Sequence, residues 1–500
     1  GGRGSYYNLS IGCDTPACPT DTYDLEAATT IQNNLTINSG STLDTVSGQN
    51  YSINISGSYT NSGSLTARSG NVTFASTATG KTLAGTMTGG SAFYNLVFNG
   101  VSGGWTFSAA VAATNDFTVT NGAVIAGNNN LTVTRDFTLA NTSGVTYTPG
   151  SSTVTISRDF IDSGNKYAYD TSTVALNGTG SITVPWQKNF YNLSVAYTGF
   201  TTSINNVAVE VRNILTLNGG TLTRITAARV YMKPQSSMTP IVFASPTTIT
   251  NVEWFFFAYS NSTLTIPAGD YGSGNWFVLS YSTNTASTSG TYSLSGDITM
   301  LHSMYGGAQY ANTTATFNTN NYTVTTTRFG YGECISWGCS NPMTLNLGSS
   351  TINFGATSSD SLYVKSNSGS HFLNMNSATI NNKQNILFAN GTGTITVNPG
   401  TSTVNLTATT TGKTITSNGQ HFYNLVTNGV GGGWTFNDAA YVDNDFTITN
   451  GAVTANNNNL TVTRDFTLAN TSGVSYTAGS STIIISRDFI DSGGKLVAGT

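Results

Sequence analysis

Apolar and polar residues alternate with a period of two along most of this chain. Clear examples are LTIN at 35–38, FTVT at 117–120, TVTI at 153–156 and TITVN at 394–398. Because successive side chains of a strand point to opposite faces, this alternation predicts short strands with one buried apolar face and one Thr-rich exposed face. Turn sequences such as NSG and TSG separate these segments, and helical periodicity is almost absent. The pattern therefore predicts an all-β protein.

The strand pattern recurs at a step of 20 to 23 residues. Phe117, Phe137 and Phe160 each follow an Asp, at intervals of 20 and 23 residues. Short strands at such a step predict a parallel β-helix, or β-solenoid, of roughly 20-residue coils, in which strands of successive coils pair. At that step the chain would form about 22 coils. Asn side chains suit turns that stack from coil to coil, and NNN at 128–130 and NNNN at 456–459 are the candidates.

A longer rhythm favours a different fold. Motifs related to FYNL begin at Tyr6, Phe93, Phe190, Phe372 and Phe422, and a weaker WFVL begins at Trp276. The steps from Tyr6 to Phe372 are 86 to 97 residues, but the last step, to Phe422, is only 50. Tandem β-sandwich domains of roughly 90 residues would repeat at such a spacing, and they are the alternative fold.

The chain also contains a duplication that is longer than both of these repeats. Residues 93–166 align without a gap onto 422–495, and 58 of the 74 positions are identical. We therefore expect a repeating unit of about 330 residues. The predicted segments are a disulfide-bearing loop region at 1–30, coils at 31–223, an irregular aromatic and basic segment at 224–260, coils at 261–330, a second disulfide loop at 331–345, and coils at 346–500 that duplicate 17–171.

The composition argues against some classes of function. Charged residues make up 8% of the 500 residues, against about 25% in typical globular proteins. The net charge of −4 and the scattered basic residues argue against a nucleic-acid partner, which needs clustered Lys and Arg. No apolar run approaches the ~20 residues of a membrane-spanning helix, so we expect no membrane insertion. The sequence begins without Met or a signal peptide, and we expect a processed piece of a longer protein.

The four cysteines form two C-x4-C pairs, Cys13 with Cys18 and Cys334 with Cys339. Two local disulfides are the simplest interpretation, and they imply an extracellular or cell-surface location. Free thiols and a metal site are the alternatives.

Arg-Asp pairs recur in the strand pattern, for example at Arg135-Asp136 and Arg158-Asp159. On adjacent coils Asp116, Asp136 and Asp159 would form a column. Such a column could bind Ca²⁺, the one cofactor considered, or cleave a glycan with paired acids. The favoured interpretation is an ion-pair ladder in which Arg neutralises Asp, and the chain is expected to have no enzymatic activity.

One segment, 224–260, departs from the rhythm and concentrates aromatic and basic residues. It is either an irregular coil with a larger core or a binding surface, because loops that leave a scaffold often carry binding residues. The candidate ligand or interface residues are Trp254, Phe255, Phe256, Arg229 and Lys233.

The possible glycosylation sites and the histidines give little evidence about function. The sequon N-x-S/T occurs 16 times, about as often as the Asn, Ser and Thr content predicts by chance, so sequons permit glycans without indicating them. The examples singled out are Asn34, Asn71, Asn130, Asn312 and Asn470. His371 and His421 each precede the Phe of an FYNL-type motif, which favours a structural role. Repeated Thr-x-Thr triplets leave ice binding as a further alternative.

The segments NLTVTRDFTLANTSG and STVTISRDF resemble the repetitive parallel β-helix parts of large secreted or cell-surface bacterial adhesin and fibre proteins. The resemblance covers most of the chain and implies a stalk, fibre or surface-layer component. We expect an extracellular structural β-solenoid without catalytic activity, whose partners are copies of itself, end to end or side by side, and surface glycans. A carbohydrate-binding or carbohydrate-cleaving β-helix is the alternative.

Overall fold

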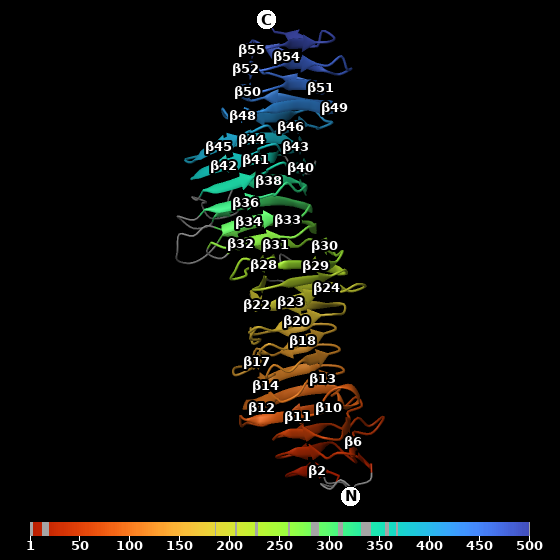
Figure 1. Ribbon diagram of the computed structural model, residues 1–500. Coiled ribbons are helices and arrows are strands. Elements are labelled where there is room, and N and C mark those ends of the chain that lie inside the picture. The colour runs from red at the N-terminus through yellow and green to blue at the C-terminus, as the bar shows by residue number, and fades with distance from the viewer. Residues whose placement is uncertain are drawn as a thin grey trace. The chain divides into compact units, whose positions relative to one another are not determined.

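The computed structural model is built almost entirely of short strands (Figure 1). Among the described residues the only helical element is one 3₁₀ turn, η1 (Gly89–Ser91). The structure describes residues 4–12, 20–185, 187–205, 208–225, 229–258, 261–281, 290–308, 314–331, 342–355, 360–366 and 369–499.

The chain divides into two compact units. The first consists of Gly1–Val230 with Val242–Thr248, and the second of Tyr231–Ile241 with Ile249–Thr500. In each unit the strands lie one above another as successive rungs (Figure 1).

Each coil contributes up to three strands, as two neighbouring coils of the first unit illustrate. One coil contains β16 (Phe137–Leu139), β17 (Thr146–Thr148) and β18 (Thr153–Ile156). The next coil contains β19 (Phe160–Asp162) and β20 (Thr173–Leu176), which pair in parallel with β16 and β18. Strands that pair with the equivalent strand one coil away define a β-solenoid, so this prediction is confirmed. Antiparallel β-sandwiches, the alternative fold, would pair their strands differently.

Some coils of the second unit are longer than the expected 20 residues. In β37 (Val324–Thr326), β40 (Thr351–Phe354) and β43 (Thr379–Asn382), the residues Val324, Ile352 and Ile380 lie opposite one another. Consecutive members of this column are 28 residues apart. Longer coils explain why the chain makes about 19 turns and not the predicted 22 or so.

The core consists of columns of side chains, one from each coil. The rings of Phe117, Phe137 and Phe160 stack with centroids 5.1 and 5.4 Å apart and interplanar angles of 3° and 12°. In the duplicated segment Phe446 and Phe466 stack at 4.9 Å and 2°. The Asp-Phe rhythm of the sequence therefore marks one aromatic column in each copy.

Comparison of the two copies shows how neighbouring coils bury each other. Phe160 lies between Phe137 and Ile182 of the adjacent coils and is fully buried. In the second copy Phe466 lies between Phe446 and Phe489 and is fully buried as well. Burial of each ring thus depends on both neighbouring coils, as expected when stability comes from nearest-neighbour interfaces.

Candidate functional site

The Arg-Asp residues of the first copy form a column of ion pairs between coils. Arg135 lies 3.1 Å from Asp116 of the preceding coil, measured from Nε to Oδ1. Arg158 binds Asp136 through both guanidinium arms, with Nε 2.5 Å from Oδ1. Asp159 accepts hydrogen bonds of 2.8 Å from the backbone N–H and the hydroxyl of Ser181. Each carboxylate of this column is therefore engaged by the neighbouring coil.

The second copy repeats the column. Arg464 lies 3.4 Å from Asp445, and Arg487 binds Asp465 through both arms, with Nε 2.6 Å from Oδ1. A further pair of this kind, Arg68 with Asp44, joins two earlier coils at 2.9 and 2.6 Å. Within the part of the chain that the structure describes, no group of three or more His, Cys, Asp or Glu side chains is placed to hold a metal ion. The arrangement is an ion-pair ladder, in which an arginine of the following coil pairs with Asp116 and with Asp136, while Asp159 lies 3.4 Å from Arg158 of its own coil.

The ladder makes an acid-sensitive contribution to stability. The Arg487 guanidinium, which donates to Asp465, holds the pKa of that carboxyl below its ordinary value of 3.8. A carboxyl with a depressed folded-state pKa stabilises the fold above its unfolded value, and this stabilisation is lost as the pH falls through the folded value. We therefore expect thermal denaturation to show a small loss of stability as the pH falls below the ordinary carboxyl pKa of 3.8. Arg487→Gln should reduce the acid-dependent part, and an unchanged pH profile in this variant would contradict the assignment.

Asparagine side chains form a second kind of ladder. Asn318, Asn346, Asn374 and Asn398 lie on successive coils, and each amide Nδ2 donates to the Oδ1 of the preceding member at 2.6–2.7 Å. A parallel ladder joins Asn353, Asn381 and Asn405 at 2.8 and 2.9 Å. These residues share one signal in the sequence, an Asn directly after an apolar strand residue, which the sequence reasoning did not use.

The predicted Asn stacks at 128–130 and 456–459 have a different role. Asn128 has a φ of 66°, and its Oδ1 accepts the backbone N–H of Ser151 at 2.9 Å. Asn130 accepts the backbone N–H of Thr153 at 2.9 Å. These turn residues therefore bind the backbone of the next coil and do not form amide-to-amide stacks. Asn tolerates the left-handed conformation that such turns require.

The aromatic run in 224–260 contributes mainly to the core. Trp254 and Phe256 lie in β31 (Glu253–Phe256) and are fully buried. The Trp254 indole N–H donates to the Tyr271 carbonyl oxygen at 3.2 Å, and Phe256 packs against Phe277 with centroids 5.0 Å apart. Neither Trp254 nor Phe256 can stack on a sugar at the surface.

A smaller aromatic and basic cluster lies on the other side of the same strands. Phe255 packs on Tyr231 with centroids 5.0 Å apart, and the Lys233 ammonium lies 5.1 and 4.8 Å from the ring centroids of Tyr231 and Phe257. Tyr231, Lys233 and Phe257 are half-buried. Arg229 is half-buried in β28 (Arg229–Met232). We call Tyr231, Lys233, Phe255 and Phe257 the cation–aromatic cluster.

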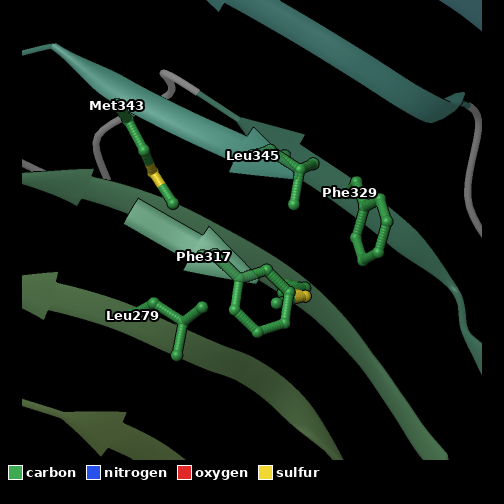
Figure 2. Close-up of a pocket in the computed structure, with 7 residues that line it drawn as sticks. Leu279, Phe317, Phe329, Met343 and Leu345 are labelled. Atoms are coloured by element: carbon green, nitrogen blue, oxygen red, sulfur yellow. The ribbon is translucent and has the colours of Figure 1, made fainter. Parts of the chain in front are cut away.

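A small cavity opens inside the second unit (Figure 2). Its volume is about 10 Å³, close to the minimum for a single water molecule. The lining is apolar and comprises Leu279, Met304, Phe317, Phe329, Gly330, Met343 and Leu345. A buried water needs two to four polar partners, which these side chains do not offer. We interpret the cavity as a packing void and not as a ligand site.

The histidines show where the two copies have diverged at the surface. The Nδ1–H of His421 donates to the Asp443 carboxylate at 2.7 Å, and the His421 ring stacks on Tyr441 with centroids 4.9 Å apart. The residues at the corresponding positions of the first copy, 329 earlier, are Ala92, Ala112 and Thr114. His371 is buried in β42 (Ser370–Asn374).

Several predicted residues lie outside the described residues or at plain surface positions. Cys13, Cys18, Cys334 and Cys339 are all outside, as is Asn312. The other sequon residues that were singled out are exposed, namely Asn34, Asn71, Asn130 and Asn470.

Sequence reasoning missed a buried ion pair. Lys188 in β22 (Lys188–Phe190) is 2% exposed and pairs with Asp162 in β19, which is fully buried, with Nζ 2.7 Å from Oδ2. The two residues are 26 positions apart in the sequence, which hides this contact, and its only signal is a Lys in a strand next to aromatic residues.

No protein-family model, curated protein or solved structure matches this chain. In the described part of the chain, no helix has the length and apolar character needed to cross a bilayer.

Proposed function

We propose that the chain is an extracellular structural β-solenoid, a fibre or filament subunit or an adhesin stalk, without catalytic activity. One observation carries the proposal: the polar groups that could perform chemistry bind a polar group of the neighbouring coil. Arg158 binds Asp136, and Asn346 binds Asn318, in each case across a coil boundary. Such contacts strengthen coil stacking and leave these groups little freedom to act on a substrate.

The duplication supports the same function. The ion-pair column and the aromatic column recur in the second copy with the same partners. A stacked structure gains length from each added unit, because neighbouring repeats supply the stabilising interfaces. The expected partners are further copies of the chain, end to end or side by side, and surface glycans.

Electron microscopy of native material, labelled with an antibody against this chain, tests the proposal. We expect label along filaments or on projections from the cell surface. Label restricted to the cell interior or to dispersed soluble particles would contradict it.

Carbohydrate recognition is the second candidate, and the cation–aromatic cluster favours it. Half-buried aromatic rings beside a Lys ammonium offer stacking faces and a charge to an acidic sugar. Glycan-array binding by the chain would support this candidate if Tyr231→Ala removed it. The matched control is Thr265→Ala, a half-buried Thr of β32 (Thr263–Ile266), which should leave binding intact.

A further inference from the structure

The buried pair Lys188 and Asp162 joins two consecutive coils of the first unit in a nearly water-free setting. The exposed fractions of the two side chains are 2% and 0%. Phe160 and Phe190 lie on the same strands as Asp162 and Lys188, and their rings and the Tyr167 ring pack together with centroids 5.3–6.3 Å apart. The Lys188 Nζ atom lies 5.5 Å from the Tyr167 ring centroid.

Three acceptors surround the Lys188 nitrogen. Nζ lies 2.7 Å from Asp162 Oδ2, 2.6 Å from the Tyr167 carbonyl oxygen and 2.9 Å from Asn165 Oδ1. If one proton passes to Oδ2, the two remaining N–H groups stay bound to Tyr167 and Asn165. The lone pair that this transfer creates then faces the Asp162 carboxyl group. Burial favours the transfer, because desolvation lowers the pKa of Lys188 and so favours the neutral amine.

The carboxyl group is held for attack by backbone donors. The N–H of Lys166 donates to Asp162 Oδ1 at 2.7 Å, and the N–H of Tyr167 donates to Oδ2 at 3.0 Å. Donors aimed at a carboxyl oxygen stabilise the negative charge that develops on it during nucleophilic addition.

The second copy shows that the local turn places these two backbone N–H donors. Asp491 accepts N–H bonds from Lys495 and Leu496 at 2.8 and 3.0 Å, in the equivalent DSGGK turn. In the first unit Lys188 places a nucleophilic nitrogen beside the carboxyl group that these donors hold.

We propose that Lys188 and Asp162 condense to an intramolecular amide that covalently links adjacent coils. The Nζ atom bonds to Cγ of Asp162, and Oδ1 carries the negative charge of the tetrahedral intermediate. Two protons of the original ammonium pass to Oδ2, the Cγ–Oδ2 bond breaks, and Oδ2 leaves as water. Ammonium and carboxylate thus give one amide and one water, without an oxidant or a co-reactant. Fixed proximity of the two groups favours the step, and exclusion of water protects the product from hydrolysis.

The link would resist separation of two coils under load. It does not depend on the proposed function, because it follows from the contacts of this one pair.

Intact-mass spectrometry of the folded, then denatured, wild-type chain tests the proposal. We expect a mass lower than that of the sequence by one water molecule. After trypsin digestion, peptide 159–166 should be joined to peptide 167–212, with Lys188 left uncleaved. A wild-type chain with the full sequence mass and free peptides would overturn the proposal and leave an ordinary buried ion pair.

Variants locate the bond. Asp162→Ala and Lys188→Arg should both show their full sequence mass, whereas Lys166→Arg, the matched control, should remain lighter by one water. Asp162→Asn should become lighter by one ammonia, because the leaving group changes. A water loss that persists in Lys188→Arg would place the bond elsewhere and contradict the assignment.

Discussion

Replacing Phe137 by Ala is expected to lower the stability of the surrounding coils by about 3–5 kcal/mol, the usual cost of removing a buried aromatic ring. Phe137 is fully buried between Phe117 and Phe160, and its edge contacts Tyr147 at 5.2 Å between centroids. The ring therefore supports two coil interfaces at once. Hydrogen exchange followed by mass spectrometry should show faster exchange in β14 (Phe117–Ile125), β16 and β19, decreasing in more distant coils of the unit.

The control is the neighbouring residue on the same strand. Thr138 points outward and is half-buried, so Thr138→Ala should change stability by less than about 0.5 kcal/mol. Phe466→Ala should reproduce the Phe137→Ala effect, because Phe466 occupies the corresponding position in the aromatic column of the second copy. Equal exchange in Phe137→Ala and Thr138→Ala would show that the aromatic column does not hold the coils together.

Gly100→Ala is expected to destabilise the first unit by about 1–3 kcal/mol, the usual cost of forcing atoms into a packed site. A Cβ atom at Gly100 would lie 1.8 Å from the Ser76 carbonyl oxygen of the preceding coil. Backbone cannot move aside as a side chain can, so the two coils must separate. The duplicate Gly429 has the same relation to the Ala408 carbonyl oxygen, also at 1.8 Å, which explains why both copies keep NGV-x-GGW.

Chemical denaturation of three glycine variants measures this effect. Gly100→Ala and Gly429→Ala should both lower the denaturation midpoint. Gly90→Ala should be nearly neutral, because a Cβ atom at Gly90 meets nothing within 4 Å. If Gly90→Ala were as destabilising as the other two, close approach of coils would not be the cause.

The sequence predicts the solenoid because its regularities are the ones that stacking requires. Alternation of Thr with apolar residues places the side chains of β15 (Leu131–Val133) alternately inside and outside. The Asp before Phe137 and Phe160 repeats once per coil, so the ion-pair column follows from the same step. Both inferences need only the local period and the knowledge that equivalent residues lie side by side.

The sequence is less informative about contacts that the local strand period does not determine. The run of bulky residues in β31 breaks the alternation, and the sequence cannot show that Phe255 is covered by Tyr231 while Trp254 enters the core. The pairing of Lys188 with Asp162 depends on how far each coil turns, because the two residues lie at different positions within their coils. Coil length also varies, and only the strand register reveals the 28-residue coils of the second unit.

X-ray diffraction from oriented native filaments tests the central claim most directly. A structural solenoid whose coils stack along the filament places its strands across the filament axis. We then expect a meridional reflection at about 4.8 Å, the spacing of paired strands. The same reflection on the equator, or native material that forms no filament containing this chain, would contradict the claim.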